Sequence, residues 1–461
     1  MSGPQPRRVL PTLHADGTRH QIHPRPSRGA FWRRRRVVAY ALIALFVALP
    51  LIPIGGKPAL LIDLGGRELT LVGATFRLTD GYLLMLLGLA IALAVFLVTA
   101  LAGRVWCGWA CPQTVWLEWV FRPLDRLFEG GPQQQRNLDR RRFAPRRIAK
   151  YAVYVALAFL LAHTFLAYFV TSTRVLSWVT GSPAAHPIGF TVVVGVTALM
   201  FLDFAYLREQ TCAIACPYGR LQAVLLDRQS LIIGYDTGRG EPRGKLRHGD
   251  PAATGDCIDC GACVTTCPAG IDIRDGLQME CIACAQCIDA CAPIMQRLGR
   301  APGLIRYTSR EELSGKPRRL LRPRTIVYPA LFAAIVATLV ALLGHRATAD
   351  VWLQRSDDAP FARLPSGEVS SPLRVRIENR TGAARTYTVD ALDPLPAARL
   401  IAPRPEWPVA AGASTVVPVF VVSPADAFVH GERAARVRVR DDAGFEKVLD
   451  VTVLGPEGGS P

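Results

Sequence analysis

The chain has 461 residues, enough for several domains, and half of them are apolar. A formal net charge of +17 raises the question of nucleic-acid binding, but no aromatic–basic recognition motif accompanies the basic residues. Composition therefore argues against a nucleic-acid partner. The arginines instead cluster beside long apolar runs, a pattern that is typical of basic loops retained on one side of a lipid bilayer.

Five apolar runs approach the roughly 20 residues that a helix needs to cross a bilayer. They are Val37–Ile54, Tyr82–Ala102, Tyr151–Val170, Ile188–Leu207 and Thr325–Leu343. The first follows too long a polar stretch to be a cleaved signal, so we expect it to remain as an anchor. The sequence thus predicts a multi-domain membrane protein built on an α-helical bundle of five spans, four within 37–207 and the fifth at 325–344.

Loop charges indicate how these spans are oriented. Basic residues crowd the segment 1–36, which contains Arg33–Arg36, and the loops 104–150 and 208–324, whereas the other two loops hold few of them. Because basic loops stay in the cytoplasm, the N-terminus and both basic loops are predicted to be cytoplasmic. The chain would then be a multi-pass protein of the bacterial inner membrane, with its C-terminal tail in the periplasm.

Past Asp350 the sequence changes to short strands separated by turn signals. Strand character is found in Leu373–Asn379, Val416–Val422, Ala435–Arg440 and Val448–Leu454. Roughly 110 residues of this kind predict an all-β, immunoglobulin-like sandwich over 350–461. The region contains no cysteine and no catalytic constellation. It is therefore expected to be a packing or docking module.

All twelve cysteines fall in C-x2-C or C-x3-C patterns, which indicates metal binding rather than disulfides. Eight of them form two runs of C-x2-C-x2-C-x3-C between the fourth and fifth spans, the spacing of bacterial two-cluster ferredoxins. In that motif the fourth cysteine of each run binds the other cluster. We therefore assign Cys257, Cys260, Cys263 and Cys291 to one [4Fe–4S] cluster, and Cys281, Cys284, Cys287 and Cys267 to a second.

Zinc is the competing interpretation of these eight cysteines, because thiolates at C-x2-C spacing also bind zinc. The doubled order of the run favours two iron–sulfur clusters. The ferredoxin domain is expected at about 250–295. A tethered ferredoxin moves single electrons, so its partner is expected in or beside the membrane.

The other four cysteines form two C-x3-C-P motifs, one after the second span (Cys107 and Cys111) and one after the fourth (Cys212 and Cys216). If the chain is helical there, each pair of thiols shares a face, and the following proline kinks that helix or starts a new one. A helix start would put Cys111 and Cys216 where the dipole lowers a thiol's pKa.

Three uses of these four thiols stay open: a site for a soft ion such as Cu(I), a further cluster, or a redox dithiol. The alternative is that they are buried structural thiols, since free cysteine packs as a small hydrophobe. The tryptophans around the first motif are interpreted as an interfacial aromatic belt. These are Trp106, Trp109, Trp116 and Trp119.

Together these residues resemble cytochrome c oxidase accessory proteins of the CcoG/FixG type. The shared features are the five spans, the segment Trp106–Trp116, the segment Cys212–Gly219, the doubled ferredoxin motif and the C-terminal immunoglobulin-like domain. The resemblance covers nearly the whole chain after about Arg33. Membrane ferredoxins of periplasmic nitrate and nitrous-oxide reduction share the C-x3-C-P pairs, so these pairs alone do not define the family.

The resemblance implies a role in assembling cbb(3)-type cytochrome c oxidase. Such a protein is expected to reduce Cu(II) to Cu(I) on the cytoplasmic side, before a copper-exporting P-type ATPase carries the ion outward. That ATPase and the oxidase assembly factors or subunits would be its partners. Cys107, Cys111, Cys212 and Cys216 would hold copper, with electrons arriving from the ferredoxin loop.

Two other functions stay open at this point. One is a quinol-linked electron-transfer subunit that passes electrons to a periplasmic partner, and the other is a non-catalytic scaffold for oxidase assembly. The electron donor is unknown, because the sequence contains no flavin or nicotinamide fingerprint.

Overall fold

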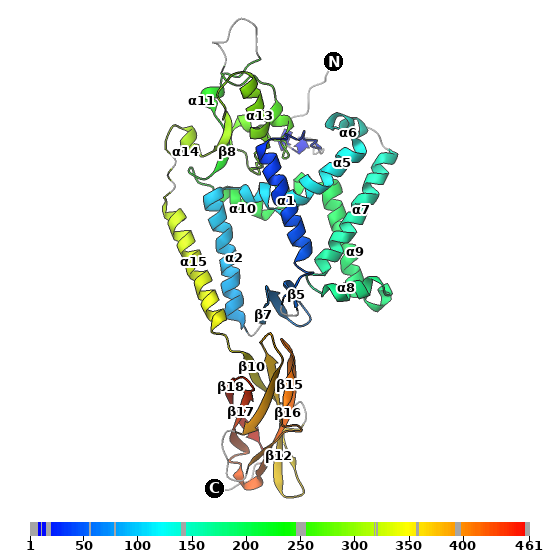
Figure 1. Ribbon diagram of the computed structural model, residues 1–461, viewed down its shortest axis with the longest axis vertical. Coiled ribbons are helices and arrows are strands. Elements are labelled where there is room, and N and C mark those ends of the chain that lie inside the picture. Colours follow the sequence, from blue (N-terminus) through cyan, green and yellow to red (C-terminus); the bar gives the residue numbers. More distant parts are fainter. Residues whose placement is uncertain are drawn as a thin grey trace. The chain divides into compact units, whose positions relative to one another are not determined.

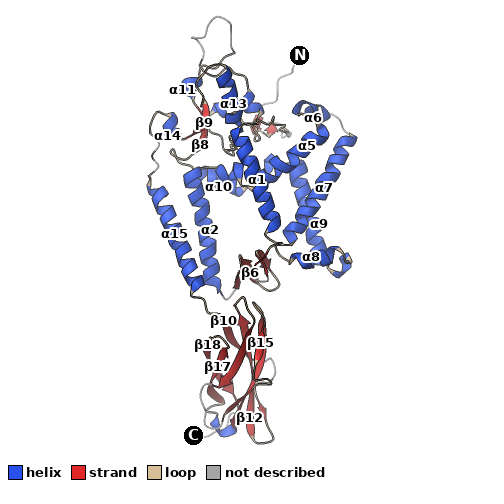
Figure 2. Cartoon of the chain, viewed as in Figure 1, coloured by secondary structure: helices blue, strands red, loops and turns tan. Residues whose placement is uncertain are grey.

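The computed structural model of the chain describes residues 8–10, 12–14, 20–54, 57–77, 80–139, 144–245, 255–317, 319, 321–355, 359–391 and 398–456. It divides into two compact units. The first comprises Met1–Ile52, Pro58–Glu68 and Leu78–Leu339, and the second comprises Pro53–Lys57, Leu69–Arg77 and Val340–Pro461. Helices dominate the first unit and strands the second (Figures 1 and 2).

Four helices among the described residues are long and apolar enough to cross a membrane. They are α2 (Gly81–Ala102), α7 (Pro145–Leu166), α9 (Pro187–Leu202) extended to Leu207 by the π-helix η4 (Asp203–Leu207), and α15 (Pro323–Gly344). At most 28% of the apolar window of any of them is buried within the protein, as expected for helices that lipid surrounds. They coincide with the second to fifth predicted spans.

The first predicted span does not meet the same criteria. Helix α1 runs from Ala30 to Ala48, so it begins ahead of Arg33–Arg36 and ends before Pro50 and Pro53. Proline cannot continue a helix, which is why the predicted span Val37–Ile54 was too long at its C-terminal end. The apolar part that remains is shorter than the roughly 20 residues that cross a bilayer. The prediction of five spans is therefore confirmed for four helices only.

Short elements connect these helices. The segments that contain or follow the two C-x3-C-P motifs form short helices. These are α3 (Val105–Trp109), α4 (Pro112–Trp116), η2 (Leu117–Phe121), α5 (Arg122–Glu129) and α6 (Pro132–Asp139) after α2, and η5 (Thr211–Ala215) and α10 (Pro217–Leu225) after η4. Elsewhere lie β1 (Arg8–Leu10), β2 (Leu13–His14), β3 (Pro53–Ile54), β4 (Lys57–Pro58), β5 (Leu60–Asp63), β6 (Glu68–Leu71), β7 (Ala74–Arg77), α8 (Ser172–Val179) and η3 (Pro183–Ala185).

The doubled cysteine motif lies in a small domain closed by the antiparallel strands β8 (Ile232–Tyr235) and β9 (Ile305–Thr308). Its other elements are α11 (Thr237–Gly240), α12 (Ala262–Thr265), η6 (Ile273–Asp275), α13 (Gln286–Arg297) and α14 (Arg310–Leu313). The domain is wider than the predicted 250–295, because strands of four residues beside a long apolar run leave little periodic signal.

Helix α1 is fixed to this domain through its first turn, and Figure 1 shows α13 next to that end of α1. The Asp289 carboxylate on α13 accepts hydrogen bonds from the main-chain N–H groups of Phe31 (3.2 Å) and Trp32 (2.7 Å). These N–H groups have no partner within their own helix, so Asp289 acts as a cap supplied by another element. The first unit therefore joins the ferredoxin domain directly to α1.

Two antiparallel sheets form the C-terminal part of the second unit. Their strand orders are β10-β12-β16-β14, with β11 on β12, and β15-β13-β17-β18. The strands are β10 (Ala349–Arg355), β11 (Ala362–Arg363), β12 (Glu368–Asn379), β13 (Arg385–Ala391), β14 (Arg399–Ile401), β15 (Trp407–Val409), β16 (Ser414–Pro424), β17 (Glu432–Asp441) and β18 (Glu446–Leu454), with the short helix η7 (Ala425–Ala427) between β16 and β17. All four predicted strands are confirmed, within β12, β16, β17 and β18.

The core of this sandwich consists mainly of β-branched side chains, including Val375, Ile377, Val417 and Val437. Asn379 is a polar residue that is fully buried at the end of β12. Its amide nitrogen donates to the carbonyl oxygens of Ala383 (2.7 Å), Val409 (3.0 Å) and Ala410 (3.2 Å). The Asn379 Oδ1 atom accepts hydrogen bonds from the main-chain N–H and the hydroxyl of Thr381.

We predict that Asn379→Leu lowers the free energy of unfolding of this sandwich by about 3 kcal/mol, because buried carbonyls lose their donors. Hydrogen-exchange mass spectrometry on the intact protein measures this as faster exchange in peptides from β12, β13 and β16. Glu446→Gln, an exposed change on β18, is the control and should leave the exchange rates unchanged. Equal protection in the Asn379 variant and the wild type would show that this side chain does not stabilise the sandwich.

Candidate functional site

The eight ferredoxin cysteines line two neighbouring cavities. The first, of about 380 Å³, is lined by Cys257, Cys260, Cys263 and Cys291. The second, of about 340 Å³, is lined by Cys267, Cys281, Cys284 and Cys287. Each group thus contains three cysteines of one run and the fourth cysteine of the other, as the motif predicts. Cys263 also lines the second cavity, so the two cavities share a wall.

Backbone conformation turns both loops around their cavities. Asp259, Gly261, Ala283 and Ala285 adopt the left-handed conformation, with φ between 50° and 64°. Successive residues in left-handed and right-handed conformations expose N–H groups on a concave surface, which suits an anionic cluster. Glycine adopts this backbone freely and aspartate tolerates it better than most residues, which suits Gly261 and Asp259, whereas at Ala283 and Ala285 it is unfavourable and the fold around the cavity must maintain it.

The donor set fits iron–sulfur clusters. Four thiols line each cavity, three from one C-x2-C-x2-C-x3-C run and one from the other. This exchange of the fourth cysteine between two runs is the ligand arrangement of two-cluster ferredoxins. Burial raises the pKa of Cys263 and of Cys281 to about 11. Iron must therefore displace protons on binding.

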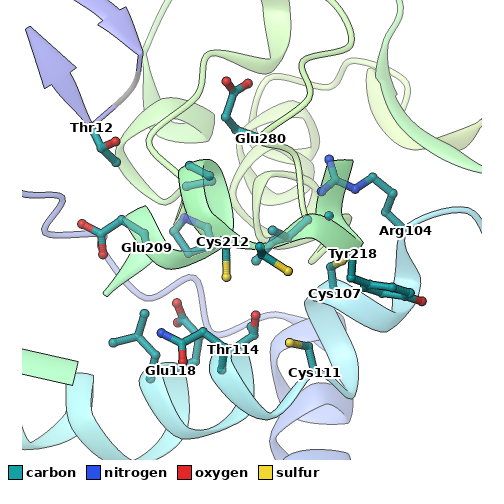
Figure 3. Close-up of a pocket in the computed structure, with 18 of the residues that line it drawn as sticks. Thr12, Arg104, Cys107, Cys111, Thr114, Glu118, Glu209, Cys212, Tyr218 and Glu280 are labelled. Carbon is teal, nitrogen blue, oxygen red and sulfur yellow. The ribbon is translucent and has the colours of Figure 1, made fainter. Parts of the chain in front are cut away.

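The four remaining cysteines line a single cavity of about 770 Å³, which we call the four-cysteine cavity. Cys107 lies in α3 and Cys111 directly before α4, whereas Cys212 lies in η5 and Cys216 directly before α10. Figure 3 shows Cys212 on one side of the cavity and Cys111 on the other. The two C-x3-C-P motifs therefore form one site, although they are far apart in the sequence.

Each motif is a helix followed by an abrupt new helix start. Cys111 and Cys216 have extended backbone, and Pro112 and Pro217 occupy the first position of α4 and α10. The predicted helix starts are thus confirmed, but at Cys111 burial outweighs the lowering of the thiol pKa that a helix start brings. Burial raises the pKa of the Cys111 thiol, despite the lowering effect of the backbone N–H groups of Gln113 and Thr114.

The same desolvation acts on two further thiols of this cavity, Cys212 and Cys107. Burial raises the pKa of Cys212 to about 12. It also raises the pKa of Cys107, an effect that the nearby Arg104 guanidinium opposes. Without a bound cation the thiols of Cys107, Cys111 and Cys212 are protonated at neutral pH. A metal ion or cluster would have to displace those protons.

Polar residues that the sequence did not single out support the cavity wall. The Cys107 thiol donates to Oε1 of Gln222 (3.0 Å), a residue that is fully buried on α10. The amide nitrogen of Gln222 in turn donates to the Tyr218 hydroxyl (2.8 Å) and to Oγ1 of Thr99 (3.1 Å). Gln222 lies six residues after Cys216 in a helix of ordinary composition, so no sequence signal marks it.

A buried ion-pair cluster forms the opposite part of the wall. The Arg122 guanidinium pairs with Glu118 and with Glu209 (3.3 Å), and these three side chains line the cavity. Arg122 also donates to the carbonyl oxygen of Pro268 (3.0 Å), the residue after Cys267. One side chain thus connects the wall of the four-cysteine cavity to the second cluster cavity.

The four-cysteine cavity and the second cluster cavity are in direct contact. Ala269 and Ile282 line both. Gly108, next to Cys107, lies so close to the cluster loop that a Cβ atom there would be 2.4 Å from the Ile282 carbonyl oxygen and 3.0 Å from the Cα of Cys284. The glycine in the first motif is therefore required for close approach of two backbones.

Two of the four tryptophans belong to this junction and not to a membrane interface. The Trp109 indole donates to the Tyr307 hydroxyl (3.3 Å), which donates to the Ala283 carbonyl (2.7 Å). Trp119 is 6% exposed, and its ring centroid lies 5.2 Å from that of Trp32 on α1. The aromatic-belt interpretation is wrong for these two residues, because they pack the ferredoxin domain and α1 against the helices.

Comparisons with known families match three separate parts of the chain. A family described as a 4Fe–4S dicluster domain matches residues 207–310, and one described as a 4Fe–4S binding domain matches residues 84–130. A third, described as the immunoglobulin-like fold at the C-terminus of FixG, matches residues 339–456. The predicted iron–sulfur domain and the immunoglobulin-like sandwich are thereby confirmed.

Whole proteins are similar over most of their length. Protein RdxA of Cereibacter sphaeroides is 35% identical over 462 residues, which cover 96% of this chain and 95% of RdxA. The nitrogen fixation protein FixG of Rhizobium meliloti is 31% identical, covering 83% of this chain and 81% of FixG. A crystal structure of a FixG-related protein from Vibrio parahaemolyticus covers 24% of this chain at 14% identity, with a TM-score of 0.21. The chain therefore belongs to the FixG/RdxA family of membrane-associated iron–sulfur proteins.

Proposed function

We propose that this protein reduces Cu(II) to Cu(I) in the four-cysteine cavity, with electrons from the ferredoxin domain. One observation carries the proposal: two separate C-x3-C-P motifs line one cavity, and that cavity shares wall residues Ala269 and Ile282 with the second cluster cavity. A thiol-lined cavity such as the four-cysteine cavity, next to an electron carrier, suits reduction of a soft metal ion.

The residues of the four-cysteine cavity suit Cu(I) better than Cu(II). Thiolate is the soft ligand that selects Cu(I), so binding by Cys107, Cys111, Cys212 and Cys216 favours the reduced ion. These thiols release their protons when the ion binds. The step itself adds one electron to Cu(II) and breaks no covalent bond. When bound in their cavities, the four-iron clusters supply that electron singly.

The proposal includes a cellular setting. Positive loop charges support a topology with the cysteine motifs and the ferredoxin domain in the cytoplasm, and the immunoglobulin-like domain in the periplasm, of the bacterial inner membrane. That topology requires α1 to be a fifth span, because it puts the two ends of the chain on opposite sides. Cu(I) formed there would be passed to a copper-exporting P-type ATPase and used in assembly of a cbb(3)-type oxidase. The electron donor would be a separate protein or quinol.

A second candidate use of the four thiols is a third iron–sulfur cluster. The match of residues 84–130 to a 4Fe–4S binding domain favours it, because that segment contains Cys107 and Cys111. In that case the cavity would relay electrons to a membrane partner, as in a quinol-linked electron-transfer subunit. A non-catalytic assembly scaffold would need neither copper reduction nor electron transfer to a partner. Iron content and copper turnover separate the three.

The decisive prediction concerns a variant with Cys107, Cys111, Cys212 and Cys216 all changed to serine. We expect the pre-reduced wild type to form Cu(I), measured anaerobically with a Cu(I) chelator, and the variant to lose this activity by at least about a hundredfold, since serine is a poor ligand for Cu(I). Iron per chain should be equal in both proteins. Thr338→Ser, a remote change on α15, is the control.

Each other outcome selects a different function. Equal Cu(I) formation in both proteins would show that copper is not reduced in the four-cysteine cavity. Loss of one cluster's iron in the variant would assign a third cluster to it. Absence of Cu(I) formation in the wild type would leave the electron-transfer subunit or the scaffold. Variants that change only one C-x3-C-P pair should be as inactive as the fourfold variant if the two motifs form one site.

A second prediction tests the junction between the two cavities. Gly108→Ala should slow the reoxidation of reduced clusters by Cu(II) about tenfold or more, because the new Cβ forces α3 away from the Cys281–Cys284 loop and displacements of ångström size cost rates of this order. Stopped-flow absorbance of the clusters measures the rate. The control is Gly195→Ala on α9, where a Cβ meets nothing within 4 Å. An unchanged rate at Gly108 would show that electrons do not pass this contact.

A further inference from the structure

Arg35 is the third of four consecutive arginines, and it differs from its neighbours in burial. Arg33, Arg34 and Arg36 are exposed on α1, whereas Arg35 is 1% exposed and is one of the largest fully buried side chains of the described residues. The charge bias that keeps basic loops in the cytoplasm requires only exposed basic residues, so it does not explain why Arg35 is buried. A buried guanidinium is costly unless it is paired.

The pairing of Arg35 is incomplete. Its Nε atom donates to the Gly108 carbonyl oxygen (2.8 Å), and its guanidinium lies 5.8 Å from the centre of the Trp119 ring. Both terminal nitrogens are buried and have no hydrogen-bond partner. No ion pair joins Arg35 to a carboxylate within the part of the chain that the structure describes. Its positive charge is therefore not neutralised by a neighbouring side chain.

The charge lies behind the second cluster cavity. Gly108, which Arg35 holds by its carbonyl, packs on the backbone of Cys284. Glu118 is paired with Arg122. The field of Arg35 at this cavity is thus positive, because no carboxylate among the described residues pairs with its guanidinium.

The first cluster cavity has the opposite arrangement. Arg274 lines it, but its guanidinium pairs with Asp272 (2.6 Å) and with Asp259 (2.6 Å). Arg239 pairs with Asp256 (2.8 Å), which lines the same cavity. Arginines beside the first cavity are therefore neutralised by carboxylates, and Arg35 beside the second is not.

We propose that Arg35 is a positioning residue that raises the reduction potential of the second cluster site above that of the first. Reduction adds a negative charge to a cluster, so a fixed positive charge in a buried environment stabilises the reduced form. An electron that enters the ferredoxin domain then settles at the site next to the four-cysteine cavity. The downstream direction of this flow rests on the proposed function, whereas the difference in potential does not.

The test is a redox titration of the full-length, anaerobically purified protein in the absence of copper. Electron paramagnetic resonance reports the reduction of each cluster. The wild type should show two midpoints. Arg35→Gln should lower the higher midpoint and leave the lower one unchanged. We expect about a tenfold loss in the equilibrium constant of reduction, which is about 59 mV for a one-electron couple. Arg36→Gln, an exposed neighbour on the same helix, is the matched control and should shift neither midpoint.

Two further variants separate charge from structure. Arg35→Lys keeps the charge, so its higher midpoint should stay near that of the wild type even if the bond to Gly108 is lost. Asp272→Asn removes one carboxylate from Arg274 and should raise the lower midpoint. This second test can be read even if the Arg35 variants fail to assemble their clusters. The proposal is overturned if Arg35→Gln shifts both midpoints equally or neither, or if Asp272→Asn leaves the lower one in place.

Discussion

Buried guanidinium groups that donate to main-chain carbonyls hold the first unit together around its redox sites. Arg35 donates to Gly108, Arg104 to Met279 and Arg122 to Pro268, and each of the three arginines is at most 6% exposed. A buried cation without partners is strongly unfavourable, so these side chains are tolerated only while the cysteine loops lie against the helices. Burial of charge and docking of the ferredoxin domain are therefore coupled.

This coupling arranges three cavities in a row. Cys263 belongs to the walls of both cluster cavities, and Ala269 and Ile282 belong to the walls of the second cluster cavity and the four-cysteine cavity. The contact at Gly108 brings two backbones together where any larger residue would separate them. An electron carrier that is fixed in this way has one defined neighbour, unlike a diffusible ferredoxin. The order of the cavities supports a route that ends at four thiols.

Hydrophobic packing between two sheets accounts for most of the structure of the β-sandwich in the second unit. Its two sheets bury alternating β-branched residues such as Val375 and Ile377, and Asn379 satisfies the carbonyls where β12 ends. Strands with clear alternation were predictable, because a half-buried antiparallel strand imposes a period of two. The short strands β14 and β15 were not, since three residues carry no measurable period.

Sequence alone determined the features that depend on neighbouring residues. Hydropathy predicted four helices that are long and apolar enough to cross a membrane. The spacing within each cysteine run grouped eight cysteines as the two cavities group them, because a tight loop determines where its own thiols point. Only the tertiary structure joined Cys107 and Cys111 to Cys212 and Cys216, and only it distinguished Arg35 from three identical neighbours. Burial and contact between distant segments depend on how helices pack, and a local pattern carries no record of that packing.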